Sequence, residues 1–453
     1  MLPELAEAQQ RMKDGRPQAA LDALAPLMAR QPRHPNANMI AARALHRLGR
    51  TGEALAHLRV CAQLVDGMPN PVAARIAVAR AFSAMGAPEE AEALLRDALA
   101  REPRSAEAMV RLGDLLRGAG RHAEALGLYR DALGLVPDSG SLWASAGVAA
   151  HGAGALDEAV PAYERALALE PGETYVYSNL LAALLELGRP DDALAHAERW
   201  VRQAPGDIEA MAFHALLLVE TGRMDEAAPL IDFDRLVRTH AIDTPAGFSG
   251  LDAFNRALEA HILAHPALAT PPEDHPTWHH PALRIASGLN RGESGPVALL
   301  EGAMHEAVER YFAETGEADG HPFLRHRPKD YEIHAWAAVL DGEGNQHPHI
   351  HMDGYLSGCY YVTIPDEISA PENGAGGGVV QGGFEVGRPP RELRIGADFP
   401  TRTVKPHEGL MVLFPAYLYH GTIPFRSGGR RICVAFDVMP AGRGEMHARE
   451  AAS

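Results

Sequence analysis

The first half of the chain repeats three residue types at a spacing of 34 residues, and no other feature limits its possible folds as strongly. Glycines recur at this spacing from Gly86 to Gly222, and an alanine follows each of them five residues later. Prolines keep the same spacing at Pro35, Pro69, Pro103, Pro137, Pro171 and Pro205. A sequence period of roughly 20–50 residues is typical of solenoids built from one supersecondary unit. The first half is therefore predicted to be a repeat array.

Each repeat is predicted to contain a helix, a turn at the glycine and a second helix. The proline ends the second helix because it donates no backbone hydrogen bond, and the alanine lies where two helices cross closely. Gly15 and Gly49 extend the series upstream, and the step from Gly49 to Gly86 is 37 residues, so one second helix or its loop is about one turn longer. Seven glycine turns predict about seven hairpins over residues 1–238.

This region resembles a tetratricopeptide (TPR) repeat array. The residues that carry the resemblance are Trp143 at the tryptophan position, Gly113 and Gly147 at the first small-residue position, and Tyr129 and Tyr163 in second helices. The resemblance implies a concave groove that binds an extended peptide or another protein. It also places Asn179, on a first helix, where such arrays contact the ligand backbone. The alternative is that Asn179 is a solvated helix residue and that the array is a spacer or a dimer surface.

The repeat spacing stops after Gly222, and residues 239–330 are predicted to form a helical lead-in and linker. LDAFNRALEAHILAHPAL and VALLEGAMHEAVERYFAE repeat apolar residues at helical spacing, so these helices are expected to brace the next domain. A proline-rich loop between them contains His275, His279 and His280. No carboxylate or cysteine is paired with these histidines, and we interpret them as surface residues.

Residues 331–453 change to short β segments bounded by glycine and proline. The segments are YEIHAWAAVL, PHIHMD, SGCYYVTI, GGVVQGGFEV, RTVKP, LMVLF and RRICVAFDV. Several strands separated by turn signals predict an antiparallel sandwich or barrel. The predicted fold is thus an all-α TPR solenoid followed by a double-stranded β-helix, of the jelly-roll or cupin-like kind. The array and the barrel are expected to have separate cores.

The segment QHPHIHMDGYLSG contains the residues with the clearest chemistry. His349, His351 and Asp353 are two residues apart, so they would point to the same face of an extended strand. His420 follows an apolar strand, and Arg431 comes eleven residues later. Two imidazoles and one carboxylate suit a non-haem Fe(II) site, because they occupy one face of an octahedron and leave the other open. Arginine offers the bidentate fork that a carboxylate co-substrate needs.

Over roughly residues 240–440 the chain resembles the Fe(II)- and 2-oxoglutarate-dependent oxygenases, most closely those fused to TPR arrays. The shared segments are HAWAAVL, HIHMDGYLSGCYYV, PHEGLMVLFPAYLYH and RRICVAFDV. The resemblance implies that Fe(II) is bound by His351, Asp353 and His420. It further implies that Arg431 anchors the co-substrate 2-oxoglutarate and that O2 is consumed. No catalytic residue beyond the metal centre is predicted.

The chain departs from this family pattern at two places. Relatives often have proline at the position of Met352 and a non-acidic residue at Asp353, so His349 is the alternative ligand, which would give an all-histidine site. The spacing favours Asp353, with His349 supporting the site or contacting substrate. Many relatives have serine at the position of Cys433, where it helps to hold 2-oxoglutarate. A thiol is a weaker donor.

We therefore predict a 2-oxoglutarate- and Fe(II)-dependent dioxygenase that hydroxylates a protein or peptide recruited by the TPR array. One alternative is a cupin-like metal enzyme that does not use 2-oxoglutarate, in which Arg431 is a structural or substrate-binding cation. The other is a TPR scaffold whose barrel is catalytically inactive.

Composition limits the partners and the compartment. The formal net charge of −17 disfavours nucleic acids and anionic membranes, which both present phosphates. No apolar run approaches the ~18 residues of a membrane span. Cys61, Cys359 and Cys433 are far apart and show no paired spacing, so no disulfide framework is expected. These features predict a cytoplasmic protein.

Overall fold

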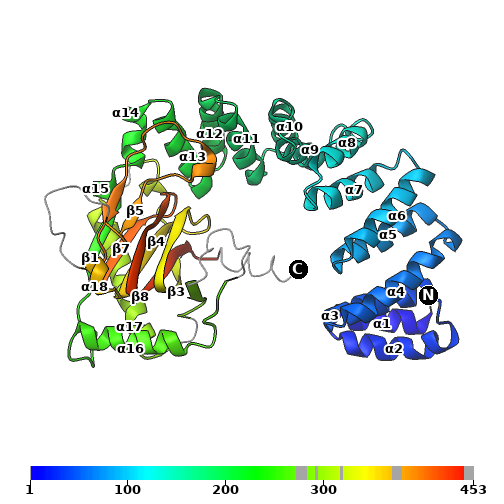
Figure 1. Ribbon diagram of the computed structural model, residues 1–453, viewed down its shortest axis with the longest axis horizontal. Coiled ribbons are helices and arrows are strands. Elements are labelled where there is room, and N and C mark those ends of the chain that lie inside the picture. The colour runs from blue at the N-terminus through cyan, green and yellow to red at the C-terminus, as the bar shows by residue number, and fades with distance from the viewer. Residues whose placement is uncertain (1, 272–282, 291–293, 317–319, 370–379, 443–453) are drawn as a thin grey trace. The chain divides into compact units, whose positions relative to one another are not determined.

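The structure, a computed structural model, divides into two compact units, residues 1–183 and residues 184–453 (Figure 1). It describes residues 2–271, 283–290, 294–316, 320–369 and 380–442. Among the described residues, no helix combines the length and the apolar character that crossing a bilayer requires.

Paired helices make up the N-terminal part of the chain, as the 34-residue spacing predicts. Within the described residues the pairs begin with α1 and α2 and end with α13 and α14, and a predicted turn glycine separates the two helices of every pair. The bounds are α1 Pro3–Lys13, α2 Pro17–Arg30, α3 Pro35–Arg47, α4 Thr51–Leu64, α5 Pro71–Ala84, α6 Pro88–Arg101, α7 Ala106–Gly118, α8 His122–Leu133, α9 Gly140–Gly152, α10 Leu156–Leu169, α11 Thr174–Glu186, α12 Pro190–Gln203, α13 Ile208–Glu220 and α14 Met224–Ala227. The prediction of a helical TPR solenoid is confirmed.

The glycines and alanines of the repeat have the roles that their spacing indicates. All seven turn glycines, from Gly15 to Gly222, have φ between 67° and 75°, a conformation that side chains with a Cβ rarely adopt. The seven alanines are all completely buried. The longer step between Gly49 and Gly86 contains an extra 3₁₀ turn, Val65–Gly67, after α4.

Close contact between helices explains the small residues of the repeat. A Cβ at Gly113 would lie 2.6 Å from the ring of Tyr129, and one at Gly147 would lie 2.6 Å from the ring of Tyr163. Each tyrosine comes from the second helix of the same pair. Any larger residue would therefore force the two helices apart.

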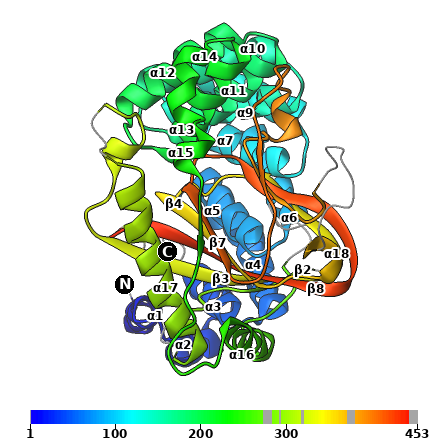
Figure 2. The ribbon, with the colours of Figure 1, turned by 90° about the vertical axis from the view of Figure 1, so that its left-hand side faces the viewer.

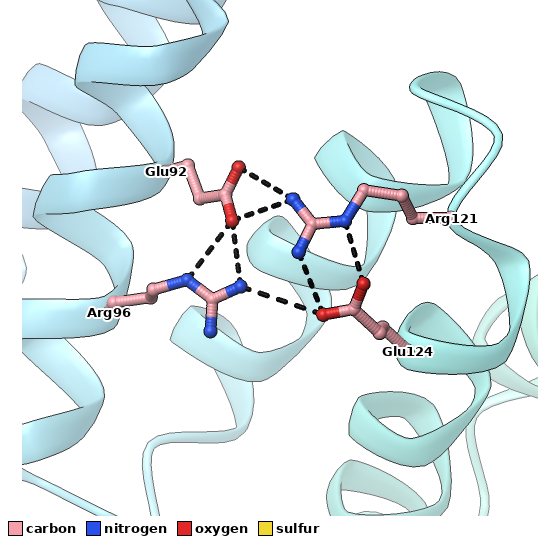
Figure 3. A network of polar contacts seen from close by, with 4 residues as sticks. All are labelled: Glu92, Arg96, Arg121 and Glu124. Carbon is pink, nitrogen blue, oxygen red and sulfur yellow. Dashed lines mark hydrogen bonds and ion pairs between the residues drawn. The ribbon is translucent and has the colours of Figure 1, made fainter.

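Charged residues link neighbouring repeats at the surface. Arg121, just before α8, pairs with Glu124 of α8 and Glu92 of α6, and Arg96 pairs with the same two carboxylates (Figure 3). Each such exposed pair stabilises the fold by only about 0–1 kcal/mol. In this network every guanidinium has a carboxylate partner.

The second unit contains a curled antiparallel sheet. Its strand order is β1-β7-β4-β8-β3-β2, and β5 pairs with both β8 and β6. The bounds are β1 Arg238–Ala241, β2 Leu283–Ala286, β3 Tyr331–His349, β4 Leu356–Thr363, β5 Phe384–Val386, β6 Arg402–Val404, β7 Leu410–Pro415 and β8 His420–Pro440. The strands β4 and β7 are buried almost throughout, which makes them the centre of the core. This agrees with the predicted jelly-roll-like fold.

Two helices cover the sheet, and they are the two that the sequence predicts. Both α16, Leu251–Ala264, and α17, Pro296–Glu314, pack against the sheet, α16 on β4 and α17 on β7. Buried Tyr360 of β4 donates its hydroxyl to Asn255 of α16 at 2.6 Å. The strands β1 and β2 were not predicted. Each has only four residues, and β1 lies at the start of the segment interpreted as a helical lead-in and β2 within it.

The last repeats belong to the same compact unit as the sheet. Glu220, at the end of α13, accepts backbone hydrogen bonds from Gly396 and Ala397. Two side chains donate hydrogen bonds to carbonyls of the segment that follows α14. The Tyr417 hydroxyl donates to Leu230, and Arg402 donates to Phe233. The short helix α15, Phe233–Leu236, then leads directly into β1. The sheet therefore depends on chain that precedes residue 239.

Truncation tests this dependence and the predicted domain boundaries. A chain that begins at residue 172, before α11, is expected to unfold cooperatively on heating. A chain that begins at residue 239 loses Leu230, Phe233 and Leu236, whose burial stabilises by about 1.5–3 kcal/mol each, and should lack a cooperative transition. Circular dichroism melting of both chains checks this. Equal melting temperatures would show that residues 172–238 are dispensable for the sheet.

Candidate metal centre

Three histidines converge where β3 ends and β8 begins. His349 is the last residue of β3, His420 is the first of β8, and the two are direct partners in the strand pairing. His351 follows two residues after β3. One ring nitrogen from each histidine lies within 4.8 Å of the others, and among the described residues no other such group of three potential ligands is found. This geometry could hold one metal ion.

Hydrogen bonds orient two of the rings toward the cluster. The Nδ1 atom of His349 lies 2.7 Å from the carbonyl of His347, and Nδ1 of His420 lies 3.0 Å from the carbonyl of Leu418. A carbonyl oxygen only accepts, so in the neutral rings the proton is assigned to Nδ1. The lone pair of Nε2 is then available to a metal.

A carboxylate fixes the third ring. Nδ1 of His351 lies 2.6 Å from Asp437 Oδ1, and the Ser357 hydroxyl donates to the same oxygen at 2.7 Å. A carboxylate behind a metal-binding imidazole fixes its tautomer and raises its basicity. Nδ1 of His351 is thus engaged in a hydrogen bond, as it is in His349 and His420, and its Nε2 is available to a metal.

Burial keeps two of the rings uncharged. It lowers the pKa of His349 to about 4 and the pKa of His420 well below its usual value, and the neighbouring imidazoles act in the same direction. Both rings are therefore neutral at pH 7. Neutral imidazole is the form that binds a metal.

Asp353 lies outside this cluster. The expectation that His349, His351 and Asp353 share one strand face was wrong, because β3 ends at His349 and the chain then turns. Asp353 is exposed in that turn. The geometry thus favours His349, the alternative ligand of the sequence analysis, and the choice between the two stays a prediction.

Arg431, the predicted co-substrate anchor, is buried on β8 with only 2% of its surface exposed. Among the described residues its Nε atom has no hydrogen-bond partner, and the guanidinium lies 5.2 Å from the ring centre of Tyr361. Nη1 contacts Cys433 Sγ at 3.8 Å. A hydrogen bond from Cys359 lowers the pKa of Cys433, and the charge of Arg431 acts in the same direction, against the effect of burial. A buried guanidinium nitrogen without a partner is a place where an anionic group could bind.

The sheet must curl to bring these residues together. His351 contacts His420 at one end of β8, with ring centres 4.9 Å apart, and Asp437 near the other end. A straight strand of 21 residues would span roughly 70 Å. Figure 2 shows the strong bend of β8 beside β3.

The sequence analysis missed Asp437, Ser357 and Tyr361. A signal for Asp437 was present, because Arg431, Cys433 and Asp437 are spaced by even numbers along one strand and so share a face. Ser357 and Tyr361 gave no such signal, since only the pairing of β4 with β8 brings them to the site.

The remaining predicted site residues lie elsewhere. The side chain of Asn179 donates to the carbonyl of Tyr175 one turn earlier in α11, at 2.8 Å. Its predicted role in the groove stays a prediction. His275, His279 and His280 lie outside the described residues.

Comparison with known families agrees with this geometry. Residues 334–437 match the family described as "Putative 2OG-Fe(II) oxygenase". Tetratricopeptide repeat families match residues 5–69, 77–140, 119–175 and 150–217. The chain combines TPR repeats with a domain that matches this oxygenase family. No curated protein matches the chain significantly.

Solved structures similar to the chain include several TPR proteins. YrrB, described as a TPR protein with an unusual peptide-binding site, is 22% identical, with 36% of this chain and 84% of YrrB covered and a TM-score of 0.33. A TPR protein from Parabacteroides merdae is 16% identical over 51% of this chain and 90% of its own, with a TM-score of 0.37. TTC0263 from Thermus thermophilus is 25% identical over 40% of this chain and 97% of its own, with a TM-score of 0.29.

The ligand set can be tested by iron content. We expect His349→Ala, His351→Ala and His420→Ala to lose bound iron, because each removes one of three donors. Asp353→Ala should retain it. Iron per chain is measured after anaerobic loading and desalting. An iron-free Asp353→Ala beside an iron-replete His349→Ala would restore the ligand set favoured by the sequence.

The orienting role of Asp437 can be tested separately. Asp437→Asn keeps the shape of the side chain but removes the charge behind His351, and loss of such a partner typically lowers metal affinity by ~10–100-fold. Titration with Fe(II) or Co(II) measures the affinity, and Asp353→Asn is the matched control. Equal weakening in both variants would mean that only the overall charge matters.

Proposed function

We propose that the protein is a 2-oxoglutarate- and Fe(II)-dependent dioxygenase that hydroxylates a protein or peptide recruited by its TPR array. The observation that carries this proposal is a cluster of three imidazoles on the same sheet as the buried Arg431, whose Nε has no partner among the described residues. The family match supports the cofactors, because that family is described as using 2-oxoglutarate and Fe(II).

The histidines fit a first-row divalent metal. Imidazole nitrogen suits iron, and three protein ligands leave coordination positions free for a chelating co-substrate and O2. His349, His351 and His420 would hold the ion through Nε2. Imidazole is an uncharged ligand, and the carboxylate of Asp437 would act indirectly, through the hydrogen bond from His351.

The charges favour an anionic co-substrate. With three neutral ligands a divalent ion keeps its positive charge, and 2-oxoglutarate, a dianion, would compensate it. Arg431 would bind the far carboxylate of 2-oxoglutarate, assisted by the hydroxyl of Tyr361. Burial strengthens such a charge-assisted hydrogen bond, because little water competes for it.

The residues of the chain have clear tasks in this reaction. The iron, 2-oxoglutarate and O2 supply the oxidation that hydroxylates a C–H bond. The three histidines fix the ion, Asp437 and the backbone carbonyls keep the protons on Nδ1, and Arg431 orients the co-substrate. The buried surroundings of His420 exclude water from the side of the core.

A large groove beside the metal centre favours a polypeptide substrate. Its volume is about 1230 Å³, and its lining includes His347, Pro348 and Gly421, which adjoin the ligands His349 and His420. Small-molecule pockets usually have ~300–1,000 Å³. We also expect the protein to act in the cytoplasm, because its three cysteines are buried free thiols.

Spectroscopy tests the use of 2-oxoglutarate. Anaerobic addition of Fe(II) and 2-oxoglutarate should produce the visible charge-transfer band of a chelated keto acid. Arg431→Gln should require at least about tenfold more 2-oxoglutarate, since a buried charge-assisted bond contributes about 1.5–3 kcal/mol. The neighbouring Arg430→Gln is the control, because Arg430 pairs instead with Asp341.

Two outcomes would favour the alternatives. Iron binding without the band would point to a metal enzyme that does not use 2-oxoglutarate. Folded protein that binds no iron would point to a scaffold with an inactive barrel.

A further inference from the structure

The first helices of three consecutive repeats line a second groove, far along the chain from the metal centre. Helices α3, α5 and α7 supply most of its lining, and its volume is about 810 Å³. Four arginines lie in this lining: Arg43, Arg47, Arg80 and Arg111. The single carboxylate among the lining residues is that of Asp114. The groove is therefore strongly basic, although the chain carries a net charge of −17.

The repeat places two of these arginines in equivalent positions. Arg43 lies six residues before the turn glycine Gly49, and Arg80 lies six residues before Gly86. Equivalent residues of successive first helices lie on the same face of a solenoid. The two guanidinium groups thus follow one another along the groove.

Arg43 and Arg80 have no partner within the part of the chain that the structure describes. Both are exposed, and neither makes a hydrogen bond or an ion pair there. Arg47 uses one nitrogen to bind the carbonyl of Met12 at 2.9 Å, and Arg111 approaches Asp114 only at 3.8 Å. The arginines of Figure 3 differ, since carboxylates bind all of them.

Apolar side chains lie between the arginines. Met39, Met85 and Leu115 contribute to the same lining. A ligand of this groove would need anionic groups for the guanidiniums and apolar groups for the surface between them. Asp114 and the overall negative charge oppose a continuous polyanion such as a nucleic acid.

We propose that this groove binds an acidic segment of a protein, in which aspartate or glutamate residues alternate with apolar residues. Guanidinium and carboxylate groups form bidentate hydrogen bonds, which hold an extended segment in register. The inference rests on the recruitment part of the proposed function and names the substrate class that the array selects. Binding requires no metal, so its failure and the failure of the oxygenase assignment are distinguishable.

The test uses the full-length, metal-free protein and a fluorescein-labelled peptide that repeats Glu-Leu-Glu-Ser. Fluorescence anisotropy should show binding that weakens as salt rises, and the matching Gln-Leu-Gln-Ser peptide should not bind. The double variant Arg43→Gln/Arg80→Gln should weaken binding by about tenfold. The matched control Arg104→Gln/Arg199→Gln removes the same charge from exposed arginines outside the groove lining and should bind as the parent does.

Three results would overturn the proposal. The first is equal binding of the glutamate and glutamine peptides, or none of either. The second is equal weakening in the groove variant and the control variant. The third is tighter binding of a single-stranded oligonucleotide than of the acidic peptide, with the same dependence on Arg43 and Arg80, which would make the groove a nucleic-acid site.

Discussion

The hydrogen bond between His351 and Asp437 holds the candidate metal centre together. Asp437 lies near the end of β8 and His420 at its start, so His351 can contact both only when the sheet has curled. The bond therefore depends on the fold and also fixes the ring that completes the cluster. Ser357, bound to the same carboxylate, adds β4 to this arrangement. Strands β4 and β8 and the chain that follows β3 thus meet at one carboxylate oxygen.

In this account different residues bind the metal and the co-substrate. His349 and His420 are neutral because burial lowers the pKa of both rings. The fixed cation is Arg431, buried beside Tyr361 and Cys433. In the sequence analysis Cys433 was expected to be a weak donor to 2-oxoglutarate. Its thiol lies 3.8 Å from Nη1 of Arg431, and its role toward 2-oxoglutarate stays a prediction.

The sequence predicted the repeat array well and the site only in part. The same local signals recur in each of the seven repeats, so the turn glycines and the buried alanines were identified correctly. A strand was predicted to continue through His351 and Asp353, whereas β3 ends at His349. Strand ends depend on tertiary packing that no local pattern reports. The strands β1 and β2 were also not predicted. Each has four residues, which is too few for an alternating pattern of apolar and polar residues to be recognised.

The central claim is that three imidazoles, without a protein carboxylate, bind the metal. An anaerobic crystal structure of the iron-loaded protein with 2-oxoglutarate tests it most directly. The account predicts an ion bound by Nε2 of His349, His351 and His420, with Asp437 still hydrogen-bonded to Nδ1 of His351. An ion bound by the carboxylate of Asp353, with His349 displaced from it, would contradict the account.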